Sequence, residues 1–311
     1  MPETTRHLLD IDGLADDELE TLINRACELA AGATARRLDA SAANLFFEPS
    51  TRTRVSFELA AARVGMQPIN IEMSQASTIK GESLEDTVAT LAAMGIDCLV
   101  LRHADIGLHA RLASALPAGV HLVNAGEGSR AHPSQALLDA ATLRARGIAT
   151  SGLKLAIVGD VRHSRVAASG LQLWQRLGVE EVRLAGPADL LPPGPPATGV
   201  VHCASLEEAV GGVDVIMMLR IQHERMDRAT WPDSAAYHKE WGLKSEHLAA
   251  AAAGCVVMHP GPINRGVEIA AEVADGDRSL ILEQVRMGVF TRMAIFEWLF
   301  GALGRGEEGE R

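Results

Sequence analysis

The sequence predicts an α/β fold made of two doubly wound parallel-sheet domains that are bridged by helices. Short apolar runs of strand length alternate with helical patterns along nearly the whole chain, which is typical of parallel sheets covered on both faces. Polar clusters directly follow several of these runs, where open α/β sheets bind their ligands. The length of 311 residues leaves room for two domains, each with its own core.

The first domain is expected to open with an amphipathic helix at 16–31, because apolar residues recur at helical spacing behind an acidic first turn. An apolar run at 44–47 then predicts a buried strand, which a proline ends because it cannot donate to a ladder. The next helix should start at Ser50 or Thr51 as its cap and run to Gly65. The other elements predicted in this half are strands at 68–72, 96–101 and 120–123 and helices at 83–94 and 106–116.

A helix at 132–146 is expected to bridge the two halves of the chain. A long apolar helix at about 281–303 is expected to pack back against the first domain. The predicted domains are therefore 1–131, completed by that C-terminal helix, and 132–280, followed by a charged tail at 304–311. The second domain is predicted to contain strands at 153–159, 181–185, 200–203, 213–219 and 255–258 and helices at 165–177 and 206–210.

Composition excludes several classes of protein. A formal net charge of −11 argues against a nucleic-acid partner, and aromatic residues are too few, at 4%, for base-stacking platforms. No apolar run reaches the ~18 residues that span a bilayer, and the N-terminus does not resemble a signal peptide, so the cytoplasm is the expected location. The four cysteines are far apart and form no metal-type pair, so we expect buried thiols.

The start of the helix near residue 50 is the clearest candidate for chemistry. Arg52 and Arg54 lie in its first turn, where the helix dipole disfavours cations and free N–H groups favour anions. Hydroxyls, N–H groups and guanidiniums that converge at a helix N-terminus make a site of phosphate size. The alternative is a basic helix start on a solvated surface.

Further polar clusters follow other predicted strands, and each has a structural explanation if taken alone. An arginine after a strand can be a surface ion pair, a histidine can start a helix, and a Gly-Pro pair can be a turn. A dinucleotide site is not expected after residue 159, because Gly-x-Gly-x-x-Gly is absent. The joint placement of these polar clusters at the ends of predicted strands indicates a ligand site. The clusters lie at 102–103, 124–128 with 132–135, 159–160 with 165, 220–222, and 259–262.

Two of these motifs resemble the signatures of the aspartate and ornithine carbamoyltransferase family. Residues 47–54 read FEPSTRTR and are similar to the family's carbamoyl phosphate signature, and residues 132–139 read HPSQALLD and are similar to its second signature. The segments LRIQHER at 219–225 and MHPGPINRGVEI at 258–269 resemble the aspartate-specific branch. The ornithine enzymes typically have His-Cys-Leu-Pro where this chain has His-Pro-Gly-Pro. The resemblance covers nearly the whole chain.

The resemblance implies carbamoyl phosphate as the first substrate. Its phosphate would be bound by Ser50, Thr51, Arg52, Thr53 and Arg102. Thr53, Arg102 and His132 would stabilise the charge that develops on the carbamoyl oxygen. The carbamoyl NH₂ group would be held by Gln135, Pro260, Gly261 and Pro262.

The resemblance also implies L-aspartate as the acceptor. Arg165 would bind its α-carboxylate, and Arg220 and Gln222 its side-chain carboxylate. Lys80, on a loop that reads SQASTIKG at 74–81, would act in the neighbouring subunit's site. Ser77 is a candidate for the loop serine of the family, although an ungapped match counted from Lys80 puts Ala76 there. No metal or other cofactor is expected, because orientation of two bound substrates can supply ~7–11 kcal/mol of the barrier.

Two alternatives to carbamoyl transfer to aspartate are less consistent with the sequence. An enzyme for ornithine or an acylated ornithine is disfavoured because ornithine would present an ammonium group to Arg220. An inactive scaffold is disfavoured because the residues that the resemblance assigns to catalysis, Arg52, Thr53, Lys80, Arg102 and His132, are all present. The resemblance implies a homotrimer whose active sites are shared between chains. It leaves open whether the trimer is bare, joins regulatory chains or binds a dihydroorotase.

Overall fold

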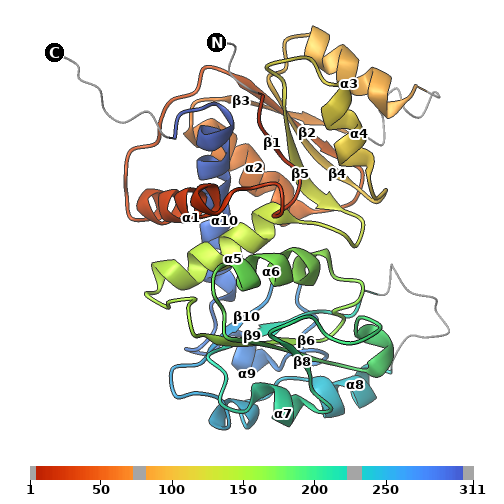
Figure 1. Ribbon diagram of the computed structural model, residues 1–311, viewed down its shortest axis with the longest axis vertical. Coiled ribbons are helices and arrows are strands. Elements are labelled where there is room, and N and C mark those ends of the chain that lie inside the picture. The colour runs from red at the N-terminus through yellow and green to blue at the C-terminus, as the bar shows by residue number, and fades with distance from the viewer. Residues whose placement is uncertain (1–4, 73–81, 223–232, 304–311) are drawn as a thin grey trace. The chain divides into compact units, whose positions relative to one another are not determined.

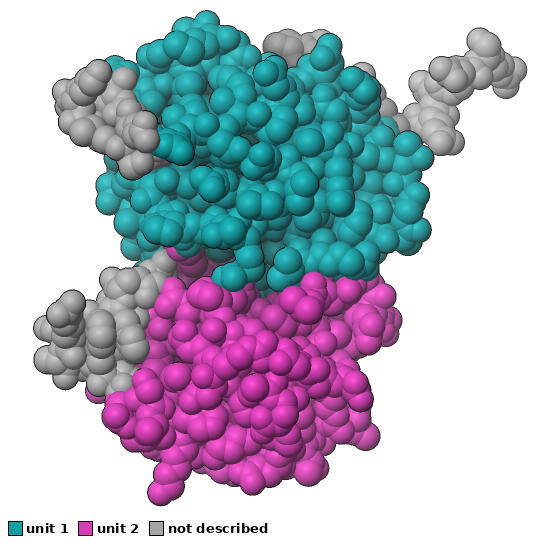
Figure 2. Space-filling model, turned by 180° about the vertical axis from the view of Figure 1, so that it is seen from behind, with its two compact units in different colours: residues 1–141, 285–311 teal, residues 142–284 magenta. Residues whose placement is uncertain are grey.

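The computed structural model describes residues 5–72, 82–222 and 233–303 (Figure 1). The chain divides into two compact units, of which unit 1 comprises 1–141 with 285–311 and unit 2 comprises 142–284 (Figure 2). Each unit contains one five-stranded parallel sheet, so the predicted fold class is confirmed. None of the helices in the described ranges is long and apolar enough to cross a membrane.

Unit 1 is built on a sheet with the strand order β1-β5-β4-β2-β3. Its strands are β1 (His7–Leu8), β2 (Ser41–Phe46), β3 (Gln67–Ile71), β4 (Cys98–His103) and β5 (His121–Glu127). Its helices are α1 (Asp16–Ala30), α2 (Thr51–Arg63), α3 (Leu84–Ala93), α4 (Leu108–Ala115), most of α5 (Pro133–Ala145) and most of α10 (Ile281–Leu299). The central strands are buried, as expected for a parallel sheet with helices on both faces.

Helix α10 joins unit 1 although it comes from the far end of the sequence. Phe296 of α10 packs edge to face on Phe57 of α2, with ring centroids 5.9 Å apart. The buried carboxylate of Glu297 accepts from Arg25 of α1 at 2.6 Å. Trp298 donates its indole N–H to Glu18 at 3.0 Å. These contacts fix α10 against both helices.

Unit 2 has a sheet with the strand order β10-β9-β6-β7-β8. Its strands are β6 (Lys154–Val158), β7 (Glu181–Ala185), β8 (Val200–His202), β9 (Val215–Met218) and β10 (Val256–Met258). Its helices include α6 (Arg165–Arg176), α7 (Leu206–Val210), α8 (Ser234–Trp241) and α9 (Ala271–Ala274). Strands β6 and β9 are buried along almost their whole length, because apolar side chains cover them on both faces.

The observed boundaries differ from the predicted ones at several points. The units meet in sequence after residues 141 and 284, whereas the prediction placed the divisions after 131 and before 281. The first turns of α5 belong to unit 1, where Cys27 of α1 donates to the carbonyl oxygen of Ala141. Helix α10 ends at Leu299 rather than at residue 303. Strand β1 and helices α8 and α9 were not predicted, since they are short or lack a clear apolar period.

Both sheets contain a point where the strand order reverses. In unit 1 the chain passes from β2 to β3 on one side and then to β4 on the other side of β2. In unit 2 it passes from β6 to β7 and β8 and then returns to β9 on the other side of β6. Ligands of open α/β sheets bind beyond the carboxyl ends of the strands at such switch points. The ends of β2 and β4, and of β6 and β9, are therefore where a site is expected.

Candidate active site

The N-terminus of α2 follows β2 at the switch point of unit 1. Ser50 occupies the N-cap position with an extended backbone, as predicted, but its hydroxyl makes no capping hydrogen bond. Thr51 and Arg52 are exposed, whereas Thr53 is buried. The first turn contains no acidic residue. The helix start thus presents hydroxyls, N–H groups and a guanidinium, which together favour an anion.

Arg102 lies beside this helix start, at the end of β4. It is paired in register with Phe46, the last residue of β2, and its carbonyl oxygen accepts the N–H of Phe47 at 3.0 Å. Its guanidinium donates to the carbonyl oxygen of Ala125 at 3.3 Å and lies 3.4 Å from the carboxylate of Glu48. The structure therefore brings Ser50, Thr51, Arg52, Thr53 and Arg102 to one switch point.

His132 and Gln135 belong to the segment that enters α5 after β5. His132 is buried directly before the helix, and its carbonyl oxygen accepts the N–H of Gln135 at 3.0 Å. Gln135 donates its amide nitrogen to Asp139 at 2.9 Å. Because a carboxylate only accepts, this contact leaves the amide oxygen of Gln135 as the acceptor for a ligand N–H group.

Asp139 connects this segment to the helix that bears the anion site. Asp139 interacts with the buried guanidinium of Arg292 on α10, which lies 4.8 Å from the ring centre of Phe57 on α2. Burial lowers the pKa of Arg292 to about 9, although Asp139 opposes this shift. Gln135, α10 and α2 are thus held by one set of contacts.

Arg220 and Gln222 follow β9, and Arg165 begins α6 after β6, so all three are at the switch point of unit 2. Arg165 is buried at a helix start that Ser164 caps by accepting the N–H of Ala167 at 3.2 Å. A buried cation at a helix N-terminus is unfavourable by itself and needs anionic partners.

Asp160 ties the two loops of this switch point together. One carboxylate oxygen accepts the N–H of Gln222 at 3.0 Å, and the other accepts the N–H of His163 at 3.2 Å. Residue 159 must be a glycine because a Cβ at this position would collide with the carbonyl oxygen of Leu219. The sequence signal at 159–160 therefore reflects close packing and loop support rather than a nucleotide site.

The turn after β10 contains Pro260, Gly261 and Pro262 and is fixed by buried polar groups. His259 accepts the N–H of Gly261 on Nδ1 at 2.8 Å, so Nε2 carries the proton and faces Glu268 at 3.1 Å. Glu268 also accepts the N–H of Asn264 at 2.6 Å. His259 and Glu268 were not singled out from the sequence as supports of this turn, although both stand in the motif at 258–269.

The structure divides the predicted residues between the two units. Ser50, Thr51, Arg52, Thr53, Arg102, His132 and Gln135 are in unit 1, and Arg165, Arg220, Gln222, Pro260, Gly261 and Pro262 are in unit 2. Lys80 and Ser77 lie outside the described residues. All four cysteines are free thiols; Cys98, Cys203 and Cys255 are buried as expected, whereas Cys27 is half-buried.

Comparison with known families identifies the class of protein. Residues 6–145 match the carbamoyl-P binding domain of the aspartate/ornithine carbamoyltransferases, and residues 151–299 match their Asp/Orn binding domain. The chain belongs to the aspartate and ornithine carbamoyltransferase family.

Several individual proteins in this family are similar to this chain over nearly its whole length. The aspartate carbamoyltransferase catalytic subunit of Xanthomonas euvesicatoria pv. vesicatoria is 48% identical over 303 residues, which cover 95% of this chain and 96% of that protein. The corresponding subunit of Stenotrophomonas maltophilia is 47% identical over 304 residues, with the same coverage. Aspartate transcarbamoylase from Trypanosoma cruzi, solved with carbamoyl aspartate and phosphate, has a TM-score of 0.84 at 29% identity and covers 94% of this chain and 95% of its own. Ornithine carbamoyltransferase from Thermus thermophilus has a TM-score of 0.81 at 26% identity, and the match covers 94% of this chain and 98% of that chain.

Proposed function

We propose that this chain transfers the carbamoyl group of carbamoyl phosphate to the amino group of L-aspartate, giving N-carbamoyl-L-aspartate and phosphate. This is the committed step of pyrimidine biosynthesis. The observation that carries the proposal is that arginine side chains stand at the switch points of both sheets. The relatives named aspartate carbamoyltransferase catalytic subunit match over 95% of the chain, which supports aspartate as the acceptor.

Carbamoyl phosphate binds at the N-terminus of α2. The hydroxyls and N–H groups of 50–53 and the guanidiniums of Arg52 and Arg102 bind the phosphate and disperse its charge as it leaves. Thr53, Arg102 and His132 donate to the carbamoyl oxygen, where negative charge grows during attack; one such donor is typically worth ~3 kcal/mol. Gln135 accepts from the carbamoyl NH₂ group, together with the turn at 260–262.

L-Aspartate binds through its two carboxylates. Arg165 takes the α-carboxylate, and Arg220 with Gln222 takes the side-chain carboxylate, because a guanidinium matches a carboxylate with two parallel hydrogen bonds. Lys80 completes this end of the site. An ornithine side chain would instead bring an ammonium group to Arg220, which repels it.

The reaction needs only groups that the substrates and this chain supply. The amino nitrogen of aspartate forms a bond to the carbamoyl carbon, and the carbon–oxygen bond to phosphate breaks with its electron pair going to phosphate. The departing phosphate takes the proton that the amine loses. Binding and orientation supply most of the rate enhancement.

The assembly that fits this function is a cytoplasmic homotrimer with active sites shared between chains. In it, Lys80 of each chain serves the site of its neighbour. A regulatory chain or a dihydroorotase is a further candidate partner.

The direct test supplies purified protein with carbamoyl phosphate and either L-aspartate or L-ornithine. We expect carbamoyl-aspartate and phosphate in equal amounts, and less than about 1% as much citrulline, because uncompensated charge at a recognition site costs several orders of magnitude. Citrulline at a comparable rate would contradict the assignment of the acceptor.

A further inference from the structure

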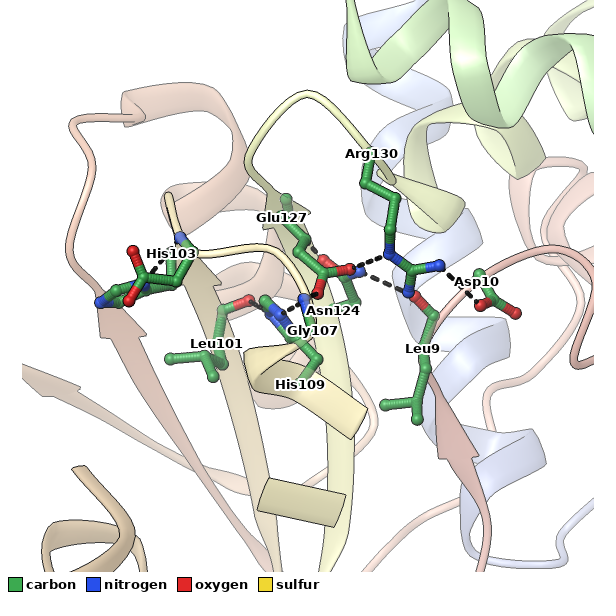
Figure 3. A network of polar contacts seen from close by, with 11 residues as sticks. Leu9, Asp10, Leu101, His103, Gly107, His109, Asn124, Glu127 and Arg130 are labelled. Carbon is green, nitrogen blue, oxygen red and sulfur yellow. Dashed lines mark hydrogen bonds and ion pairs between the residues drawn. The ribbon is translucent and has the colours of Figure 1, made fainter. Parts of the chain in front are cut away.

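The carboxylate of Glu127 is fully buried at the carboxyl end of β5 and is surrounded by donors (Figure 3). One oxygen accepts the backbone N–H of Gly107 at 2.6 Å and lies 3.6 Å from Nδ1 of His109. The other accepts Nε of Arg130 at 2.7 Å. Arg130 also reaches Asp10 at 3.3 Å. A buried charge needs such partners, because desolvation would otherwise exclude it.

The groups around this carboxylate come from separate segments of unit 1. Gly107 and His109 form the start of α4, which follows β4, and Arg130 is in the turn between β5 and α5. Asp10 follows β1. The carboxylate therefore connects the loops at the ends of three strands that are neighbours in the sheet, in the order β1-β5-β4.

His109 adds a directional constraint. Its Nε2 lies 3.0 Å from the carbonyl oxygen of Leu101, which can only accept, so Nε2 carries a proton. Nδ1 then faces the carboxylate of Glu127. The ring is therefore fixed to the last part of β4 through Nε2 and packs beside Glu127, with 3.6 Å between Nδ1 and the carboxylate.

The end of β4 and the turn after β5 also carry residues of the proposed carbamoyl phosphate site, Arg102 and His132. Arg102 donates to the carbonyl oxygen of Ala125, and the carbonyl oxygen of His103 accepts the N–H of Gly128 at 2.9 Å, so the end of β4 is bonded to β5 and to the turn that follows it. The N–H of Glu127 donates to the carbonyl oxygen of Ala131 at 2.9 Å and closes the turn directly before His132. A shift of this turn would move His132, and a shift at the end of β5 would move Ala125, the carbonyl partner of Arg102.

We propose that Glu127 is a positioning residue for the reaction, which acts through the loops after β4 and β5 to set Arg102 and His132. It does not touch the substrate. The inference rests on the proposed function, since it assigns Arg102 and His132 to carbamoyl phosphate. An ionised carboxylate accepts all its donors at once, whereas the amide of a glutamine would present a donor to one of them.

The test compares Glu127→Gln with Glu297→Gln as a matched control. Glu297 is also fully buried in unit 1, and it accepts from the guanidinium of Arg25 at 2.6 Å and from the N–H of Arg36 at 2.7 Å. It joins α1 to α10, however, and does not connect the loops at the strand ends. We expect both variants to lose thermal stability. Glu127→Gln should also lower kcat about tenfold or more and raise KM for carbamoyl phosphate about tenfold, with KM for aspartate changed less than about twofold.

Glu127→Asp keeps the charge on a shorter side chain and should recover about threefold or more of the lost kcat. Arg130→Gln, at a half-exposed position, serves if Glu127→Gln does not fold, and should raise KM for carbamoyl phosphate about threefold. Equal kinetics in the Glu127→Gln and Glu297→Gln variants would overturn the proposal and leave Glu127 with a structural role. Unchanged kinetics in Arg130→Gln would overturn it as well.

Titration with inorganic phosphate separates this inference from the proposed function. We expect Glu127→Gln to bind phosphate about tenfold more weakly than both the wild type and Glu297→Gln. This binding measurement does not require the acceptor substrate. A wild type that binds phosphate but makes no carbamoyl-aspartate would refute the function alone. Equal phosphate affinity in all three proteins would refute the positioning role.

Discussion

The arginines of the candidate site differ in how the protein holds them. Arg102 is set by its strand, by the carbonyl oxygen of Ala125 and by the nearby carboxylate of Glu48. Arg165 is buried at the start of α6. Arg52 is exposed on the first turn of α2. Substitution of Arg52 should therefore affect ligand binding with little effect on folding.

Arg52→Ala is expected to lower kcat/KM for carbamoyl phosphate at least ~100-fold, because it removes a charge-assisted contact to the phosphate. Steady-state kinetics and a thermal melt measure the two effects. Arg63→Ala, at an exposed position in the last turn of the same helix, is the control and should stay within about threefold of wild type. Wild-type kinetics in the Arg52 variant would mean that the motif at 50–53 is only structural.

The lowered pKa of the Glu127 carboxyl group makes the free energy of unfolding depend on pH. Burial would raise its pKa, but the nearby ring of His109 and hydrogen bonds from Arg130 and the N–H of Gly107 lower it to about 2, against 4.5 as the ordinary value. The unfolded chain therefore binds the proton first as pH falls. The stabilisation is complete above about pH 5 and is lost towards pH 2, by on the order of 3 kcal/mol.

Denaturant unfolding at several pH values between 2 and 6 measures this loss. Glu127→Gln should be less stable than wild type at neutral pH and should lose less stability on acidification. If both proteins lose the same free energy over this range, the carboxylate of Glu127 does not have the depressed pKa.

At the scale of elements, α2 illustrates how packing permits an unfavourable helix start. Its first turn carries arginine rather than acid, and Ser50 makes no side-chain cap. Packing compensates, since Phe57 is fully buried against Phe296 and Arg292 of α10. Helices in proteins owe most of their stability to such packing. The N-terminus of α2 is where the proposed function places carbamoyl phosphate.

The turn between β5 and α5 depends on Gly128, which has a φ of 45°. A Cβ at this position would lie 2.7 Å from the carbonyl oxygen of Ala104, which belongs to the backbone and cannot move aside cheaply. Gly128→Ala should therefore destabilise unit 1 by about 2 kcal/mol or more and should reduce activity, because His132 follows this turn.

Gly147→Ala is the matched control for this substitution. Gly147 has a φ of 73°, but a Cβ there would meet no atom within 4 Å. It should cost only the backbone strain, about 1 kcal/mol. Thermal melts and the activity of both variants compare the two positions. Equal loss of stability at both positions would mean that the close approach of Ala104 has no energetic consequence.

At the scale of the whole molecule, the proposed substrates are divided between two units of similar design. Each sheet reverses its strand order once, between neighbouring strands that carry the proposed anion-binding residues at their carboxyl ends. Unit 1 holds the proposed phosphate residues and unit 2 the proposed carboxylate residues. Lys80 is proposed to come from a neighbouring chain, which makes the trimer part of the function.

Mixed trimers test this sharing. Lys80→Ala and His132→Ala homotrimers should each be nearly inactive. A Lys80→Ala chain keeps its own His132, and a His132→Ala neighbour can lend it Lys80. In a random equal mixture about a quarter of the sites combine both intact residues, so up to about a quarter of wild-type activity should return. Chain exchange is verified by mass. Activity that stays at the level of the separate variants would show that Lys80 does not serve a neighbour.

The main alternation of strands and helices could be predicted because each apolar run has the period of its element. The helix at 16–31 and the strands near 44–47 and 213–219 all formed within a few residues of the predicted bounds. Strand β5 was underestimated, since it continues to Glu127 through Asn124 and Gly126. Its polar residues are buried and satisfied by long-range bonds such as that from Asn124 to the carbonyl oxygen of Leu9, which no local period reveals.

The sequence by itself determined the fold class, the family resemblance and the residue types of the candidate site, because periodicity and short motifs are local properties of the chain. Only the tertiary structure decided the strand order, and with it which loops meet at the switch points. It also identified the supporting carboxylates Glu127, Asp160 and Glu268. Their hydrogen-bond partners lie on other segments of the chain, and a buried charge is recognised by partners that folding alone brings together.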